Sequence, residues 1–273
     1  MSTDSITFIG GGNMARSLIA GLVRQGTAPG NIHVAEPVAE LRSQLTTDFG
    51  VKIYASATEA AAQGAVWVLA VKPQVLRDVC ASLADIAQAK APLVVSIAAG
   101  ITSAQLLRWL GGAGAVVRAM PNTPALLGAG VTGLFATSGV SAEQRGQADT
   151  VLASAGRTVW IEDEARMDAV TAVSGSGPAY VFLLAEAMEA AGIAQGLPAD
   201  AARTLVVQTL LGASRMLDES GEAPTELRRR VTSPNGTTQA AIESFQGDDF
   251  EAIVARAIDA ATRRGQALSA TND

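Results

Sequence analysis

Short apolar runs alternate with longer amphipathic stretches along residues 1–162. The run at residues 65–71 is apolar almost throughout, which is typical of a strand buried on both faces of a parallel sheet. Helical spacing of apolar residues follows the first run and recurs at residues 36–48, 74–88 and 142–155. This alternation predicts a doubly wound α/β domain. The predicted strands are residues 6–9, 32–35, 51–54, 65–71, 93–97, 115–119, 130–137 and 158–161.

From residue 163 onward the pattern is helical only, so residues 163–273 are predicted to form an all-α second domain. The segment at residues 179–191 carries only Glu186 and Glu189 as charges, which indicates a helix that is nearly buried. A second domain this small offers little interior for such a helix, so we expect it to pack against another subunit. The chain is therefore predicted to form at least a dimer through this domain. The predicted helices are residues 164–173, 179–191, 199–219, 225–231, 238–245 and 250–268.

A glycine-rich turn joins the first predicted strand to the first predicted helix. Gly10, Gly12 and Ala15 occupy the small-residue positions of the pattern G-x-G-x-x-G/A. There the first glycine permits the turn, the second lets the backbone approach a pyrophosphate, and the third small residue lets helix pack on strand. Unpaired N–H groups and the positive end of the helix dipole then face the anion. The turn therefore predicts a dinucleotide-binding site.

Glu36 follows the second predicted strand, where a dinucleotide-binding fold places an acidic residue that accepts hydrogen bonds from the adenosine ribose. The alternative is a charge favoured by the dipole at a helix start, since Glu36 and Pro37 also open the next predicted helix. If Glu36 binds the ribose, it repels a 2'-phosphate, which favours NADH. Arg42 compensates only if its helix turns it toward the ribose.

In doubly wound sheets, ligands bind beyond the carboxyl ends of the strands. Besides the glycine turn and Glu36, those ends carry residues 71–73, residues 98–100 and Asn122, and we expect these loops to form one crevice. Lys72 is the only lysine on this predicted rim. We expect it either to anchor a carboxylate or phosphate, or to be a solvated lysine at a strand end.

A polar loop at residues 233–238 immediately precedes a predicted helix. It supplies hydroxyls, an amide and a glycine where several backbone N–H groups lack partners within the helix. These donors and the helix dipole would bind a substrate carboxylate well. The alternative is ordinary N-capping by Ser, Asn or Thr, but a cap needs one such residue and this loop has four, besides its glycine.

Composition and charge argue against several other functions. The 273 residues carry a formal net charge of −6, and no basic block is longer than residues 228–230, so we expect no nucleic-acid partner. A single histidine, His33, and a single cysteine, Cys80, give no metal-ligand cluster, so no metal is expected, and a Ser-His-Asp triad would depend on a strand residue. One cysteine and no secretory signal are consistent with a cytoplasmic protein. Prolines and glycines interrupt the charge-free residues 119–142, so no membrane helix is expected.

Several motifs along nearly the whole chain resemble those of the pyrroline-5-carboxylate reductase family. The first is common to many dehydrogenases, whereas the last two are close to diagnostic of this family. The motifs are Phe8-Ile9-Gly10-Gly11-Gly12-Asn13-Met14-Ala15, Ala70-Val71-Lys72-Pro73, Met120-Pro121-Asn122-Thr123-Pro124, Asp168-Ala169-Val170-Thr171-Ala172-Val173-Ser174-Gly175-Ser176-Gly177-Pro178-Ala179-Tyr180, and Val231-Thr232-Ser233-Pro234-Asn235-Gly236-Thr237-Thr238.

The resemblance implies a doubly wound Rossmann-type nucleotide domain followed by an all-α C-terminal dimerisation domain. It implies reduction of 1-pyrroline-5-carboxylate to L-proline with NADPH or NADH, the last step of proline biosynthesis. It also implies a substrate site shared between one subunit's nucleotide domain and its partner's helical domain, in homodimers that can assemble into decamers. Cofactor binding is implied for Ile9, Gly10, Gly11, Gly12, Asn13, Met14, Ala70, Val71, Lys72, Pro73, Ile97, Ala98, Ala99 and Glu164. Substrate binding is implied for Ser233, Asn235, Gly236, Thr237 and Thr238.

The Thr238 hydroxyl is implied to hydrogen-bond the ring nitrogen, which makes Thr238 the candidate catalytic residue. A carbon–nitrogen double bond accepts hydride more readily when nitrogen is protonated, so the reaction needs orientation and a polar partner for nitrogen more than a strong acid. A threonine supplies such a partner. The cofactor carries the hydride, while the carboxylate clamp fixes which ring carbon faces the nicotinamide.

Three alternatives remain. Hydroxyacid dehydrogenases of similar build carry a lysine and, one turn later, an asparagine after the glycine-rich helix start. Here Val181 and Ala185 stand at those positions, so alcohol oxidation lacks its general base. Some relatives of these reductases keep the fold as regulatory or binding proteins, although the retained loop at residues 233–238 argues against that function. A reductase of another cyclic imino acid is the third alternative.

Overall fold

The structure is a computed structural model that describes residues 5–112 and 114–271. It divides into two compact units. The first, here called the sheet unit, extends to Ser176 and resumes at Ala260, and the second, the helical unit, is Gly177–Asp259. The two units are defined by residue contacts within each unit, whereas the boundary predicted after residue 162 marks the change from strands to helices. Among the described residues no helix is long and apolar enough to cross a membrane.

The described part of the sheet unit contains one eight-stranded sheet in the order β3-β2-β1-β4-β5-β6-β7-β8. Neighbouring strands are parallel except for β6 and β7, which are antiparallel. Successive strands are added outward in both directions from the β1–β4 pair, so the strand order reverses between these two strands. The strands are β1 (Ile6–Ile9), β2 (Ile32–Ala35), β3 (Lys52–Tyr54), β4 (Val66–Leu69), β5 (Leu93–Ser96), β6 (Ala115–Met120), β7 (Gly130–Ala136) and β8 (Gly156–Trp160).

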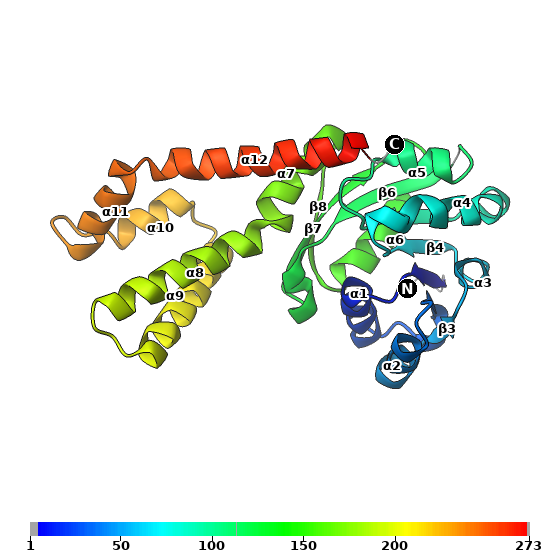
Figure 1. Ribbon diagram of the computed structural model, residues 1–273, viewed down its shortest axis with the longest axis horizontal. Coiled ribbons are helices and arrows are strands. Elements are labelled where there is room, and N and C mark those ends of the chain that lie inside the picture. Colours follow the sequence, from blue (N-terminus) through cyan, green and yellow to red (C-terminus); the bar gives the residue numbers. More distant parts are fainter. Residues whose placement is uncertain (1–4, 113, 272–273) are drawn as a thin grey trace. The chain divides into compact units, whose positions relative to one another are not determined.

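Helices cover both faces of this sheet (Figure 1). The α-helices of the sheet unit before residue 177 are α1 (Asn13–Arg24), α2 (Ala39–Phe49), α3 (Ala57–Ala61), α4 (Pro73–Lys90), α5 (Ser103–Trp109), α6 (Ala142–Ala153) and α7 (Met167–Val170). Shorter turns of 3-10 helix lie at Pro29–Asn31, Thr123–Leu127 and Glu164–Arg166, and a π-helical turn lies at Thr171–Gly175.

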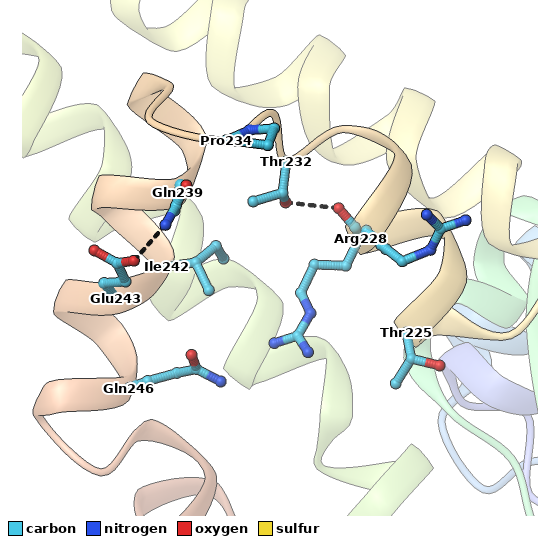
Figure 2. Close-up of a pocket in the computed structure, with 9 residues that line it drawn as sticks. Thr225, Arg228, Thr232, Pro234, Gln239, Ile242, Glu243 and Gln246 are labelled. Carbon is cyan, nitrogen blue, oxygen red and sulfur yellow. Dashed lines mark hydrogen bonds between the residues drawn. The ribbon is translucent and has the colours of Figure 1, made fainter.

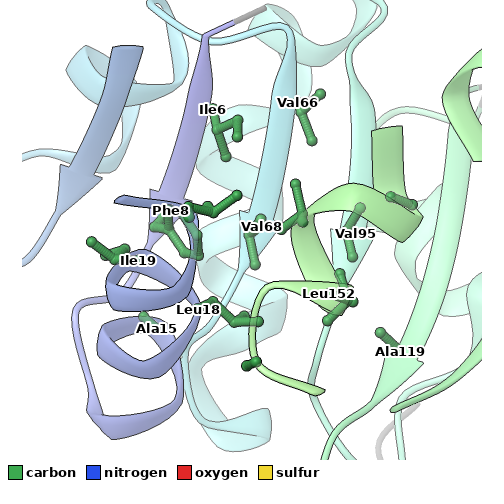
Figure 3. Packing of buried hydrophobic residues seen from close by; sticks show 14 of the residues in the cluster. Ile6, Phe8, Ala15, Leu18, Ile19, Val66, Val68, Val95, Ala119 and Leu152 are labelled. Carbon is green, nitrogen blue, oxygen red and sulfur yellow. The ribbon is translucent and has the colours of Figure 1, made fainter. Parts of the chain in front are cut away.

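Two apolar cores lie on the two faces, because alternate residues of each strand point in opposite directions. On one face Phe8 and Val68 pack against Leu18 of α1 and Leu152 of α6 (Figure 3). On the other face strand residues such as Trp67 pack against α3, α4 and α5. All four residues of β1 and of β4 are buried, as predicted for a parallel sheet covered on both sides.

Local differences from the predicted elements have simple causes. Helix α2 begins at Ala39 instead of Glu36, because the Glu36 carboxylate folds back to accept the Val38 N–H. The sequence pattern does not predict α3 and α5, which are only five and seven residues long. The helix predicted at residues 164–173 is a succession of 3-10, α and π turns that continues to Gly175.

The helical unit contains two long helices that run side by side, α8 (Gly177–Ala194) and α9 (Ala199–Glu219) (Figure 1). It continues with α10 (Pro224–Arg230), α11 (Thr237–Gly247) and the first part of α12 (Phe250–Thr271). Helix α8 has no buried residue within the single chain, so the predicted burial of residues 179–191 depends on another subunit and stays a prediction. Phe182 and Leu183 are 66% and 65% exposed.

Helix α12 returns the chain to the sheet unit at Ala260. There the Gln105 side chain of α5 donates a hydrogen bond to the Ser269 carbonyl, with Nε2 and O 3.2 Å apart. Gly265 lies against Asp168, and a Cβ at Gly265 would stand 2.9 Å from the Asp168 Oδ1. The last turns of α12 are thus part of the packing around α5 and α7.

Candidate active site

The glycine-rich turn lies at the carboxyl end of β1, where the strand order reverses. Gly10 has φ of +105°, a backbone conformation that favours glycine, and its N–H donates to the Ala35 carbonyl at 2.9 Å. A Cβ at Gly10 would stand 2.7 Å from the Ala70 carbonyl oxygen. The turn therefore requires glycine at this position both for its conformation and for its close approach to the end of β4.

Helix α1 begins in open space. Its N-cap is Gly12, no side chain caps it, and a Cβ at Gly12 would meet nothing within 4 Å. The first N–H groups of the helix, from Asn13 onward, therefore face outward together with the positive end of the dipole. This is the geometry that a pyrophosphate requires, so the residues fit a dinucleotide.

The Glu36 side chain is buried beneath this turn, 7% exposed. Its Oε2 accepts the Gly11 N–H at 3.1 Å and its Oε1 accepts the Val38 N–H at 3.0 Å. The Arg42 guanidinium donates to the Glu36 and Pro37 carbonyls, both at 2.7 Å. Glu36 therefore braces the glycine turn, which the sequence does not indicate, while its negative charge remains at the end of β2.

The loops after β4 and β5 stand beside the glycine turn, because β1, β4 and β5 are neighbours in the sheet. The Ala70 N–H donates to the Ile9 carbonyl at 2.8 Å, and the Ile97 N–H donates to the Leu69 carbonyl at 3.2 Å. Lys72, the N-cap of α4, is exposed and no side chain caps that helix. The sheet thus brings together Val71, Lys72, Pro73, Ala98 and Ala99 with the glycine turn at one edge.

Asn122, which is predicted to line the same crevice, holds two segments together. Its Oδ1 accepts the Val131 N–H at 2.9 Å and its Nδ2 donates to the Ser174 carbonyl at 3.2 Å. The side chain is nearly buried, at 9% exposed. Both ends of the Asn122 amide thus join β7 to the π-helical turn, and the placement of Asn122 among the crevice loops stays a prediction.

Glu164 accepts three hydrogen bonds. The Ser103 N–H and the Arg118 Nη1 donate to its Oε1 at 2.7 Å and 2.8 Å, and the Ser103 hydroxyl donates to its Oε2 at 2.5 Å. Burial works to raise the pKa of this carboxyl, but the Ser103 and Arg118 contacts outweigh it and lower the pKa below its usual value. Burial, with the charge of Glu164, raises the pKa of the nearby Asp168, although Arg118 opposes the shift.

The polar loop of the helical unit ends at Gly236, the N-cap of α11, and no side chain caps this helix. Asn235 has φ of +58°, and its N–H donates to the Gln239 Oε1 at 2.7 Å. Within the described chain, the hydroxyls of Ser233, Thr237 and Thr238 make no intramolecular hydrogen bond, and all three residues are exposed. Ordinary capping by Ser, Asn or Thr is therefore not the role of this loop.

A pocket of about 460 Å³ adjoins the loop between α10 and α11 (Figure 2). The Thr232 hydroxyl donates to the Arg228 carbonyl at 2.7 Å, and the Gln239 amide donates to Glu243 at 2.6 Å. The sequence predicts only the neighbouring loop, not this pocket. The pocket is lined by Thr225, Arg228, Arg229, Thr232, Pro234, Gln239, Ile242, Glu243 and Gln246.

His33 and Cys80 take part in packing. The His33 Nδ1 lies 2.9 Å from the Tyr54 hydroxyl, and burial together with Lys52 lowers the pKa of His33. Burial raises the pKa of the Cys80 thiol to about 12. Neither residue belongs to the predicted site.

The predicted site residues thus form two sets, one in each compact unit. Sequence reasoning missed the partners that hold the first set, above all Ser103 and Arg118. A signal for Arg118 was present, because a charge inside the apolar run Ala115–Met120 needs a buried partner. Nothing in the sequence spacing shows that this partner is Glu164, 46 residues away.

Two family models match the chain. The model described as pyrroline-5-carboxylate reductase dimerisation matches residues 164–268, and that described as NADP oxidoreductase coenzyme F420-dependent matches residues 5–100. Pyrroline-5-carboxylate reductase of Pseudomonas aeruginosa is 52% identical over 269 residues, with 98% of each chain covered. A solved pyrroline-5-carboxylate reductase from Coxiella burnetii, 40% identical, superposes with a TM-score of 0.95 over 98% of this chain and 99% of its own. The Plasmodium falciparum enzyme, solved with NADP bound, has 28% identity and a TM-score of 0.85 over 98% and 99% of the two chains.

The sheet has a Rossmann-type strand order, and helix α1 starts at an uncapped glycine where that order reverses. A dimerisation region follows the sheet. Together these features define a Rossmann-type NAD(P)-dependent oxidoreductase that forms homo-oligomers. The relatives that match almost the full chain identify the family. The chain belongs to the pyrroline-5-carboxylate reductases, oxidoreductases of CH–NH bonds.

Proposed function

We propose that this protein reduces 1-pyrroline-5-carboxylate to L-proline with NADPH or NADH, the last step of proline biosynthesis. The observation that carries the proposal is the start of α11, where Gly236 leaves the first N–H groups uncapped beside the exposed hydroxyls of Ser233, Thr237 and Thr238. Such a helix start binds a small carboxylate through its donors and its dipole.

The cofactor is proposed to lie along the carboxyl edge of the sheet. When bound, it supplies the hydride. The open start of α1 would hold its pyrophosphate, and the loops after β4 and β5 would line the nicotinamide side. The residues proposed for this role are Ile9, Gly10, Gly11, Gly12, Asn13, Met14, Ala70, Val71, Lys72, Pro73, Ile97, Ala98 and Ala99, with Glu36 at the ribose and Glu164 in the surrounding shell.

The substrate carboxylate is proposed to be held by Ser233, Asn235, Gly236 and Thr237. Thr238 then accepts a hydrogen bond from the protonated ring nitrogen through its Oγ1, which keeps the proton on nitrogen and fixes the ring plane. Holding the carboxylate at one end of the ring presents the imine carbon to the hydride donor, and this orientation contributes much of the rate.

Glu36 bears on the choice of cofactor. Its carboxylate is held by Gly11 and Val38 at the end of β2, so the charge cannot swing away from a ribose placed there. A 2'-phosphate would meet this charge, which favours NADH. The Arg42 guanidinium is engaged by backbone carbonyls, so it offers little compensation.

The homo-oligomer is proposed to be a dimer through the helical domain, residues 163–273, with the nucleotide domain, residues 1–162, completing the partner's substrate site. Exposed apolar side chains along α8, such as Phe182 and Leu183, support this assignment. Dimers are further proposed to assemble into decamers. The single, buried Cys80 accords with a reducing compartment, which we propose to be the cytoplasm.

The test is oxidation of NADPH and, separately, of NADH on addition of 1-pyrroline-5-carboxylate, with the product identified as L-proline. We expect absorbance loss with both cofactors and L-proline in equal amount. If folded protein that binds the nucleotide gives no turnover, the proposal fails. Piperideine carboxylates in the same assay then distinguish a reductase of a larger imino acid from a regulatory relative.

A further inference from the structure

Helix α5 carries two separate sets of hydrogen bonds at its N-terminus. The Thr102 hydroxyl accepts the Gln105 N–H at 3.2 Å while the Gln105 side chain accepts the Thr102 N–H at 2.7 Å, which is a complete capping box. Glu164, 61 residues further on, also accepts the N–H and the hydroxyl of Ser103. Because the capping box already supports the helix, the Glu164 contact serves chiefly to fix where the helix begins.

The six residues before this point, 97–102, form the loop between β5 and α5. At its beginning the Ile97 N–H donates to the Leu69 carbonyl at 3.2 Å. The side chains of Ala98 and Ile101 are buried, whereas Ala99 is exposed at the carboxyl edge of the sheet. The loop is thus anchored to the sheet at its first residue and to Glu164 directly after its last.

Arg118 connects Glu164 back to the sheet. It lies on β6 directly opposite Ser96, the last residue of β5, and its side chain is only 9% exposed. Its Nη1 donates to the Glu164 Oε1 at 2.8 Å. A chain of contacts therefore joins the two ends of the loop. Ser96 pairs with Arg118 across the sheet, Arg118 donates to Glu164, and Glu164 accepts from Ser103. The distance between those ends is therefore set largely by part-buried, charge-assisted hydrogen bonds to Glu164.

We propose that Glu164 is a positioning residue for the nicotinamide cofactor, acting through Ser103 and the start of α5 to hold residues 97–99 in place. The inference rests on the proposed function, in which those residues line the nicotinamide side. It makes the action of Glu164 indirect, since both carboxylate oxygens already accept hydrogen bonds from Ser103 and one of them also accepts from Arg118.

The first test compares Glu164→Gln with the wild type in direct binding of NADPH and NADH, followed by quenching of protein fluorescence. We expect the dissociation constants to rise about three- to tenfold, the range for losing part of a charge-assisted contact. In steady state, KM for the nucleotide should rise while KM for 1-pyrroline-5-carboxylate stays within about twofold. Glu162→Gln, an exposed neighbour that loses the same charge, is the control and should bind as the wild type does.

The second test separates indirect action from direct contact. Ser103→Ala leaves the carboxylate in place but removes the hydroxyl that links it to α5, so it should weaken nucleotide binding in the same direction. The double variant should then be less impaired than the product of the two single effects. Unchanged binding in Ser103→Ala, or fully multiplicative effects, would overturn the proposal.

The positioning role can be tested even if one variant does not fold, and independently of the proposed reaction. Ser103→Ala alone carries the test if Glu164→Gln does not fold, as judged by circular dichroism and a cooperative thermal transition. Nucleotide binding needs no turnover, so failure to reduce 1-pyrroline-5-carboxylate contradicts the proposed function only. Normal reduction with normal nucleotide binding in both variants contradicts the positioning role only.

Discussion

At the scale of single residues, side chains of similar chemistry differ in whether they already have partners. The carboxylates of Glu36 and Glu164 are held by backbone and side-chain donors, and Asn122 uses both ends of its amide. The Thr238 hydroxyl has no intramolecular partner within the described chain. Polar groups that are held shape the site, and exposed groups without partners remain available for a ligand.

Replacing Thr238 by alanine tests the proposed catalytic hydroxyl. The variant should fold normally, because the side chain is exposed, but kcat should fall about tenfold to a hundredfold through loss of a hydrogen bond to a charged nitrogen. Steady-state kinetics with saturating nucleotide measures the effect. Thr238→Ser, which keeps the hydroxyl, should recover most of the rate, and full activity of the alanine variant would remove Thr238 from the mechanism.

The charge of Glu36 should control the choice between the two nucleotides. Glu36→Gln keeps the shape and one acceptor oxygen for the Gly11 or Val38 N–H, but it removes the repulsion of a 2'-phosphate. The ratio of kcat/KM for NADPH to that for NADH should rise about tenfold. Glu40→Gln, an exposed change on the following helix α2, should leave the ratio unaltered. An unaltered ratio in Glu36→Gln would show that Glu36 only braces the turn.

The contacts of Glu164 also make stability depend on pH. Its pKa is lowered on folding, so the ionised carboxylate stabilises the protein above the pKa of the unfolded chain, and this stabilisation is lost as the pH falls through the folded value. Urea unfolding should show Glu164→Gln less stable by about 1 kcal/mol at neutral pH. The difference should shrink below about pH 4. A difference that stays constant across this range would contradict the assignment.

At the scale of elements, two pairs of helices begin in contrasting ways. Helices α5 and α6 start with complete capping boxes, from Thr102 with Gln105 and from Ser141 with Gln144. Helices α1 and α11 start at glycine with no side-chain cap, and these are the two helix starts assigned to ligands. A side-chain cap would occupy the donors that an anion needs, so the glycine starts of α1 and α11 suit binding, whereas the capping boxes of α5 and α6 suit stability.

An acidic N-cap on α1 should weaken nucleotide binding and slightly raise the free energy of unfolding. Gly12→Asp fits, because a Cβ there meets nothing within 4 Å, and its carboxylate can accept the first N–H groups of the helix. We expect the free energy of unfolding to rise by a few tenths of a kcal/mol and nucleotide affinity to fall about tenfold or more. Calorimetric binding measures the loss, with Gly12→Ala as the uncharged control. Unimpaired binding in the aspartate variant would place the pyrophosphate elsewhere.

Much of the sheet can be predicted from the sequence because burial on both faces leaves continuous apolar runs such as Val66–Leu69. The glycine turn and the loop at residues 233–238 follow from backbone requirements that few residues meet. Helix α5 is too short for its spacing to show. The partner of Arg118 and the buried role of Asn122 depend on segments far apart in the chain, which no local pattern encodes.

At the scale of the whole molecule, the two units differ in how they bury apolar side chains. The sheet unit has two cores, one on each face of its sheet. In the helical unit the long helix α8 has no buried residue, and Leu184 and Met188 are exposed along with Phe182 and Leu183. Apolar surface of this extent is the mark of an interface, which accords with the match of residues 164–268 to a dimerisation region.

A charge on this surface should weaken the assembly. Phe182→Glu removes an apolar side chain whose burial contributes about 2–3 kcal/mol, at each symmetry-related position of a dimer. Sedimentation velocity at several concentrations should show dissociation of the variant where the wild type remains associated. Val75→Glu, an exposed apolar residue on α4, is the control and should not dissociate. A Phe182→Glu protein of unchanged sedimentation would place the interface on other surfaces.

The return of α12 to the sheet unit sets an order of events during synthesis. Residues 260–271 leave the ribosome only after the entire helical unit has been made, yet α5 needs them, since Gln105 bonds to Ser269 across 164 residues. Translation at about 5–20 residues per second thus leaves the nascent sheet without its last packing partner for several seconds. During that interval the surface of α5 and α7 that α12 later covers is open to chaperones and to neighbouring chains.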